Sequence, residues 1–183
     1  MNFIRTEIEG VYLIEPNVLH DDRGEFFRTY DEKLFFDMGF KKKFVQHNHS
    51  NNFRKGTWRG FHYQLPPYAE TKLIQCVSGK VYDVVLDIRK GSGTFLQWRG
   101  FELSALNKLQ VIIPEGCAHG FLTMEDDAVL VYHHTQFYNK EAEAGIRFDD
   151  PMIKFKMAAE MNKISIRDQS YTFLQPDFKG IDL

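Results

Sequence analysis

The chain has 183 residues, of which 43% are hydrophobic and 26% are charged, and 23 basic residues are balanced by 25 acidic ones. This length suits a single domain over residues 1–183, and the balanced charge argues against nucleic acid or an anionic membrane as the partner. No apolar run approaches the roughly 20 residues that cross a bilayer. Two cysteines, Cys76 and Cys117, are too few for a disulfide framework and fit a reducing cytoplasm, although one bridge between them stays open.

The aromatic residues, 15% of the chain, favour a β-rich fold. We expect a first strand at residues 11–14 and, after a polar turn, a second at residues 25–30. Asp31 is expected to cap a short helix over residues 33–36, and Gly39 suits the left-handed position that ends it.

Strand patterns follow one another almost without pause after residue 44. Residues 73–77 and 81–89 flank Ser78-Gly79-Lys80, and their period of two predicts a hairpin or a tight strand connection. Further strands are expected at 109–113 and 128–133, and minor helices at 140–144 and 158–162. Many short strands with regular turns predict an all-β jelly-roll sandwich or barrel with a few short peripheral helices.

A turn sequence at residues 114–119, Pro-Glu-Gly-Cys-Ala-His, resembles the second motif of the cupin jelly rolls, Pro-x-Gly-x-x-His. A β-turn followed by a core histidine would give the same pattern. Where the first cupin motif places a second His and a Glu, this chain has Gln64 and Lys72. A protonated lysine offers only N–H donors and repels a cation, so we expect no metal. A fixed ammonium can instead stabilise an oxyanion, which points to enolate chemistry.

Collinear segments over roughly residues 11–170 resemble the dTDP-4-dehydrorhamnose 3,5-epimerase family. They are 20–24, 44–50, 59–64, 72–73, 114–121, Tyr132 and 145–151. The resemblance implies a cupin-type jelly roll and a cytoplasmic, homodimeric isomerase without a cofactor. Its substrate would be a nucleotide sugar, dTDP-4-keto-6-deoxyglucose, inverted at C3 and C5 for dTDP-L-rhamnose or a related deoxysugar. Both carbons adjoin the C4 carbonyl, so loss of either proton gives an enolate, and reprotonation from the other face completes the inversion.

Four residues match the family's catalytic groups. His62 matches the general base, a role that suits imidazole because it titrates near neutral pH. Asp168 matches the carboxylate that fixes the tautomer of this histidine. Tyr132 matches the acid that returns a proton from the opposite side, and Lys72 the group beside the C4 oxygen. Taken singly, each would be an ordinary core or surface residue. Their catalytic roles are therefore implied only by the match of their positions to the family's sequence pattern.

The resemblance also implies a set of substrate-binding residues. They are Arg23, Phe26, Arg28, Gln46, Asn48, Arg59, His119, Tyr138 and Arg167. Arginine suits a diphosphate because its planar group donates two parallel hydrogen bonds, and Tyr138 is placed to stack near the base. His119 either assists in the pocket or supports it.

Two departures from the family pattern keep alternatives open. Arg28 stands where the family usually has Glu, and His133 and His134 follow Tyr132 where it usually has Lys. The nearest alternative is a mono-epimerase that inverts only C3 or only C5 of another nucleotide-linked sugar. A second is a non-catalytic carbohydrate- or nucleotide-binding jelly roll. A metal-dependent cupin would require convergence among His49, His62, His119, His133 and His134.

Overall fold

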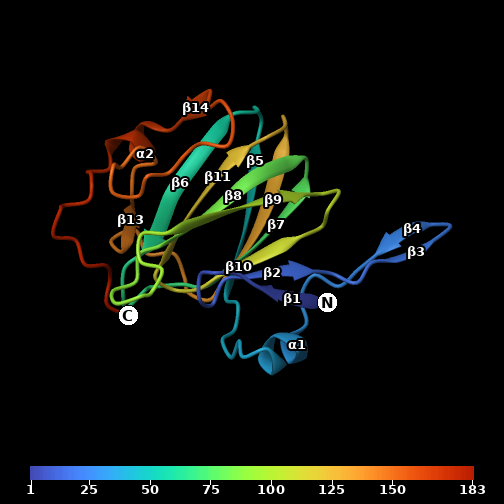
Figure 1. Ribbon diagram of the computed structural model, residues 1–183. Coiled ribbons are helices and arrows are strands. Elements are labelled where there is room, and N and C mark those ends of the chain that lie inside the picture. The colour runs from blue at the N-terminus through green and yellow to red at the C-terminus, as the bar shows by residue number, and fades with distance from the viewer.

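Two sheets face each other in the computed structural model, which describes residues 1–183 (Figure 1). Sheet I has the order β1 (Asn2–Arg5), β2 (Tyr12–Glu15), β10 (Gln110–Ile113), β7 (Lys72–Ser78), β12 (Ala128–His134) and β5 (Gln46–Asn52). Sheet II has the order β13 (Glu143–Gly145), β6 (Thr57–Gln64), β11 (Cys117–Thr123), β8 (Lys80–Asp87) and β9 (Trp98–Ser104), and β14 (Lys163–Ile164) pairs with β6. The helices α1 (Glu32–Asp37) and α2 (Ile166–Ser170) are peripheral, and neither is long and apolar enough to cross a membrane. The predicted all-β fold is confirmed.

Alternation along strand β8 divides its side chains between two hydrophobic cores. Val81 and Val85 point between the sheets, into a core that also contains Leu130 of β12. Val84 and Leu86 point outward, where the chain after residue 145 covers the outer face of sheet II (Figure 1). Both faces of β8 are therefore buried, which explains its nearly continuous apolar sequence.

Helix α1 covers part of the outer face of sheet I. The Asp31 side chain caps it by accepting a hydrogen bond from Leu34 N at 3.1 Å, as predicted. Phe35 is fully buried, and its ring makes edge contacts with Phe3 and Tyr30 at centroid separations of 5.2 and 4.8 Å. These aromatic contacts hold the helix against the sheet.

Several expected strands differ in detail. Strand β1 precedes the expected first strand and pairs with it, and the strand expected at 25–30 ends at Phe26. The pattern around Gly79 is a tight connection rather than a hairpin, because β7 and β8 lie in different sheets. Gly79 has φ +66°, a conformation in which glycine turns the chain from one sheet to the other. Cys76 and Cys117 are buried free thiols, so the disulfide left open by the sequence does not form.

The two expected C-terminal helices are wrong. Residues 140–142 form a turn, and the chain then enters β13, whose backbone pairs with β6. Between 158 and 162 there are bends, and Asn162 N and Lys163 N both donate to Gly56 O instead of to a helical turn. The real helix, α2, has five residues and was missed because it is too short for an amphipathic period. Its signal is Ser165, whose hydroxyl accepts from Asp168 N at 3.0 Å.

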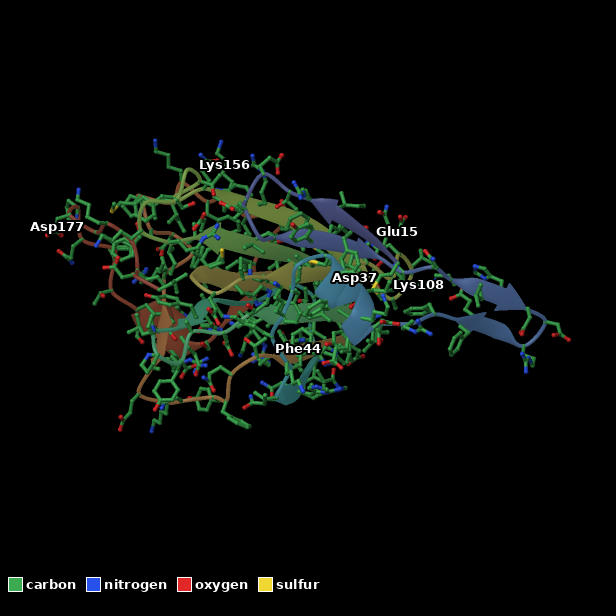
Figure 2. The ribbon with its side chains drawn as sticks, turned by 90° about the horizontal axis from the view of Figure 1, so that it is seen from below. Glu15, Asp37, Phe44, Lys108, Lys156 and Asp177 are labelled. Carbon is green, nitrogen blue, oxygen red and sulfur yellow. The ribbon has the colours of Figure 1, made fainter.

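The hairpin of β3 (Leu19–Asp21) and β4 (Gly24–Phe26), which we call the arm, projects away from the two sheets (Figure 1). Figure 2 shows Lys108 beside its base, and Lys108 Nζ lies 2.9 Å from a carboxylate oxygen of Glu25. Leu19 and Phe26 are 65% and 70% exposed. The arm therefore offers apolar side chains that its own chain does not cover.

Candidate active site

A cavity of about 610 Å³ opens between the inner faces of the two sheets. It collects most of the residues expected from the sequence, namely Asn48, Arg59, His62, Lys72, His119, Tyr132, Tyr138 and Arg167. Its lining is mostly polar, unlike the apolar core that fills the rest of the space between the sheets. The cavity is therefore the candidate active site.

His62 and Asp168 form a hydrogen-bonded pair at the cavity wall. His62 Nε2 lies 2.7 Å from Asp168 Oδ1, and Gly60 N donates to the other carboxylate oxygen at 3.3 Å. Burial by itself would raise the pKa of Asp168, but the hydrogen bonds from His62 and Gly60 outweigh it, and the pKa is lowered. A charged carboxylate at Nε2 keeps the imidazole proton there. Nδ1 is then free to accept a proton from a substrate.

Gly60 brings β6 and β11 close enough to place two histidines side by side. A Cβ at this position would collide with the backbone of Gly120, and φ is +130°. His119 is the register partner of His62, and its Nε2 lies 2.7 Å from Asp83 Oδ2. Burial lowers the pKa of His119, although Asp83 opposes the shift. His119 therefore supports the pocket as a neutral imidazole at neutral pH.

Tyr132 and Lys72 lie on the opposite wall, on neighbouring strands of sheet I. Both point between the sheets and line the cavity that His62 lines from sheet II. Burial raises the pKa of the Tyr132 hydroxyl, so this group carries its proton at neutral pH. Lys72 Nζ donates to His62 O at 3.3 Å. A base and a protonated hydroxyl thus approach the same cavity from facing sheets.

The other expected binding residues in this region form a polar rim. Tyr138 donates its hydroxyl proton to Glu143 at 3.0 Å, and Arg167 Nη1 donates to the same carboxylate at 2.7 Å. Arg59 Nε donates to a side chain of β5, Asn52 Oδ1, at 2.7 Å. Gln46 lies behind the lining and accepts a hydrogen bond from Tyr138 N at 3.0 Å.

Three expected binding residues do not reach the cavity of their own chain. Arg23 lies on the arm and bonds to Asp21 within the same hairpin. Phe26 is exposed on the arm, and Arg28 pairs with Asp31 at 2.6 Å near α1. Because the arm projects from the sheets, the expectation that these residues join the site fails for an isolated chain.

The structure adds carboxylates that the sequence analysis missed. Glu70 and Glu143 line the cavity, and Asp83 supports His119 from behind. Asp83 had a signal in the sequence, because it is a charged residue at an inward position between the apolar residues Val81 and Val85. Glu143 had no such signal, since it lies in a segment that we expected to be a helix.

The histidines do not form a metal site. No group of three or more His, Cys, Asp and Glu side chains has the arrangement that could hold a metal ion. His133 points to the other side of sheet I, where its ring packs against His47 at a centroid distance of 4.4 Å. His62, His119 and His134 each face a carboxylate instead. The geometry therefore does not favour the metal-dependent alternative.

Asp168→Asn is expected to lower kcat by about 10- to 100-fold with little change in KM, because an amide can donate to Nε2 and shift the proton to Nδ1. Steady-state kinetics would measure this. Asp149→Asn, which changes an exposed carboxylate paired with Arg147, is the matched control and should behave as wild type. A rise in KM alongside the fall in kcat, with loss of the folded structure, would count against a role in fixing the tautomer.

Comparisons with known proteins point to one family. The model of a family described as dTDP-4-dehydrorhamnose 3,5-epimerase matches residues 5–176. A relative of that name from Shigella flexneri is 46% identical over 180 residues, 97% of this chain and 99% of the relative. The solved structure of the enzyme of that name from Bacillus anthracis, with TDP and PPi bound, has a TM-score of 0.91 and 37% identity, over 94% of this chain and 99% of that one. The dTDP-6-deoxy-D-glucose-3,5-epimerase of Legionella pneumophila, in complex with dTDP-4-keto-L-rhamnose, has a TM-score of 0.89 and 34% identity, over 100% and 98% of the two chains.

Proposed function

Since the chain belongs to the dTDP-4-dehydrorhamnose 3,5-epimerase family, we propose that this cavity inverts C3 and C5 of dTDP-4-keto-6-deoxyglucose. The observation that carries the proposal is the placement of the His62–Asp168 pair and the Tyr132 hydroxyl on facing sheets, with Lys72 on the same wall as Tyr132. An inversion needs a base on one face of the carbon and an acid on the other.

In the proposed reaction, His62 Nδ1 removes the proton from C3 or C5. The electron pair of the broken C–H bond forms a C–C double bond, and the carbonyl electrons move to O4. The Lys72 ammonium stabilises the oxyanion, and Tyr132 then donates its proton to the opposite face of the same carbon. Because its pKa is raised, the Tyr132 phenolate is a strong base and regains a proton readily, while the His62 imidazolium releases one to solvent. The same steps at the second carbon complete the double inversion.

A homodimer is the proposed assembly, with the arm of each copy reaching the cavity of the other. The residues expected to bind the nucleotide divide into two sets, one in the cavity and one on the projecting arm. Arg23 would then add a cation for the diphosphate and Phe26 an apolar surface for the base, opposite Tyr138. The exposed apolar side chains of the arm support this arrangement, because they are otherwise left in water.

Phe26→Ala is expected to raise KM about tenfold and to leave kcat within about twofold, because the arm binds the nucleotide and not the reacting carbons. Steady-state kinetics would give both constants, and sedimentation equilibrium would give the oligomeric state. Leu106→Ala, which truncates another exposed side chain, is the control. An unchanged KM, or a monomer with full activity, would contradict the exchanged arm.

The proposed location is the cytoplasm. Both cysteines are free thiols buried in the core, and burial raises the pKa of Cys76 to about 11 and that of Cys117 to about 12. Unpaired cysteines of this kind fit a reducing compartment.

The decisive experiment incubates the protein with dTDP-4-keto-6-deoxyglucose in deuterated water and follows C3 and C5 by NMR. We expect deuterium at both carbons with inversion at both. Deuterium and inversion at only one carbon would indicate the mono-epimerase. Binding without any exchange would indicate the non-catalytic jelly roll and would refute the proposed function.

A further inference from the structure

A buried carboxylate that the proposed mechanism does not use faces the ammonium of Lys72. Glu70 Oε1 lies 3.2 Å from Lys72 Nζ, and the two side chains are only 9% and 8% exposed. The other oxygen, Glu70 Oε2, lies 2.8 Å from His134 Nδ1. All three side chains line the cavity. Charges this deeply buried are stable only when paired, so Glu70 and Lys72 each favour the charged form of the other.

A chain of hydrogen bonds fixes where the proton of His134 lies. The backbone Tyr138 N can only donate, so Gln46 accepts it through Oε1 and donates through Nε2 to Asn48 Oδ1 at 3.1 Å. The Asn48 amide nitrogen therefore faces His134 Nε2, at 3.2 Å, and that ring nitrogen accepts. His134 then carries its proton on Nδ1 and donates it to Glu70. In this network His134 is neutral, and the charge of Glu70 is balanced by Lys72.

The same contacts orient the ammonium. Lys72 has three N–H donors, of which one faces Glu70 and one donates to His62 O at 3.3 Å. The third is left for an oxygen in the cavity. Without the carboxylate, a lysine this deeply buried would lose its proton more readily, because burial disfavours the charged form.

On the basis of the proposed function, we propose that Glu70 is a positioning residue that keeps Lys72 charged and aimed at the oxygen that becomes the enolate. Glu70 does not touch the substrate in this scheme and acts through Lys72. His134 holds the carboxylate in place as a neutral donor.

The groups around Lys72 do not obscure this effect at neutral to alkaline pH. Those that face it are Glu70 in the loop just before β7, Tyr132 and His134 on β12, His62 on β6, His119 on β11 and Asp83 on β8 behind it. Burial raises the pKa of Tyr132 and lowers that of His119, so both are neutral there. Burial alone would raise the pKa of Glu70, but the hydrogen bond from His134 and the charge of Lys72 outweigh it. Glu70 thus stays ionised as pH rises.

The test is the pH dependence of kcat for Glu70→Gln, measured by deuterium incorporation between pH 7 and 9. Glutamine keeps the size of the side chain and removes its charge. Wild-type kcat should stay level, whereas that of the variant should fall by up to about tenfold per pH unit, because its buried ammonium has lost the paired carboxylate, with KM little changed. Glu102→Gln removes a carboxylate from a surface pair with Lys80, 3.7 Å apart, and should keep the wild-type profile.

Two outcomes would overturn the inference. One is a Glu70→Gln profile that runs parallel to wild type, with or without a uniform loss, because that indicates a structural role; the other is a wild-type profile that itself falls over this range. If Glu70→Gln does not fold, Glu70→Asp keeps the charge but shortens the reach, and kcat must then drop at unchanged KM; an unchanged kcat refutes the role. Wild-type protein that exchanges no deuterium at any pH would instead refute the proposed function.

Discussion

His62→Ala is expected to lower the rate of deuterium incorporation at both C3 and C5 by roughly 10²- to 10⁴-fold, the typical contribution of a positioned general base. Both carbons should be affected equally, because the cavity presents one histidine whose proton is held on the far nitrogen by Asp168. Binding should persist, since His62 is one of many polar groups in the lining. NMR of the substrate in deuterated water measures the rates, and calorimetry with TDP measures binding.

His133→Ala is the matched control for this variant. It removes a histidine next to Tyr132 in sequence but on the outer side of sheet I, where it packs against His47 and Phe44. Its exchange rates should equal those of wild type. Exchange retained at either carbon in His62→Ala would show that a second base serves that carbon, and His119 would be the first residue to examine.

The fold was largely predictable because its strands are strongly patterned. Strand β8 carries apolar side chains on both of its faces, and the Asp31 cap and the Pro114 turn are local signals that do not depend on the rest of the chain. The pairing of strands was not predictable in the same way. The turn at Gly79 fits a hairpin or a tight connection equally well, and it joins two sheets because pairing is decided by strands distant in sequence.

Some residues of the candidate site were likewise predictable from local sequence, and others were not. His62, Lys72 and Tyr132 share one cavity because each lies at an inward position of a regular strand, and register with a known family was enough to find them. Glu70 lies in a loop with no motif around it, and its importance appears only when His134 on β12 is seen beside it. Arg23 and Phe26 were predicted at the site only from their sequence register with the family. That register does not show whether they enter the cavity of their own chain or that of a second copy.

Tyr132→Phe is expected to separate exchange from inversion. Without the hydroxyl, His62 can still remove a proton and return a deuteron to the face from which the proton left. Deuterium should therefore enter C3 and C5 with retained configuration, while inversion falls by roughly 10²- to 10⁴-fold. Phenylalanine fits the same space, so the pocket should keep its shape. NMR and chromatography of the sugar products, taken from one reaction, measure the two rates together.

The control for this variant is Tyr82→Phe, which removes a hydroxyl from the outer face of sheet II, away from the cavity. Both of its rates should match those of wild type. If Tyr132→Phe loses exchange and inversion in equal proportion, the hydroxyl is needed to form the enolate and not only to quench it. If inversion persists, the acid is another group or a water molecule. A selective loss of inversion would place the acid on sheet I and the base on sheet II. Exchange can continue without inversion only if the base and the acid act on opposite faces of the sugar ring.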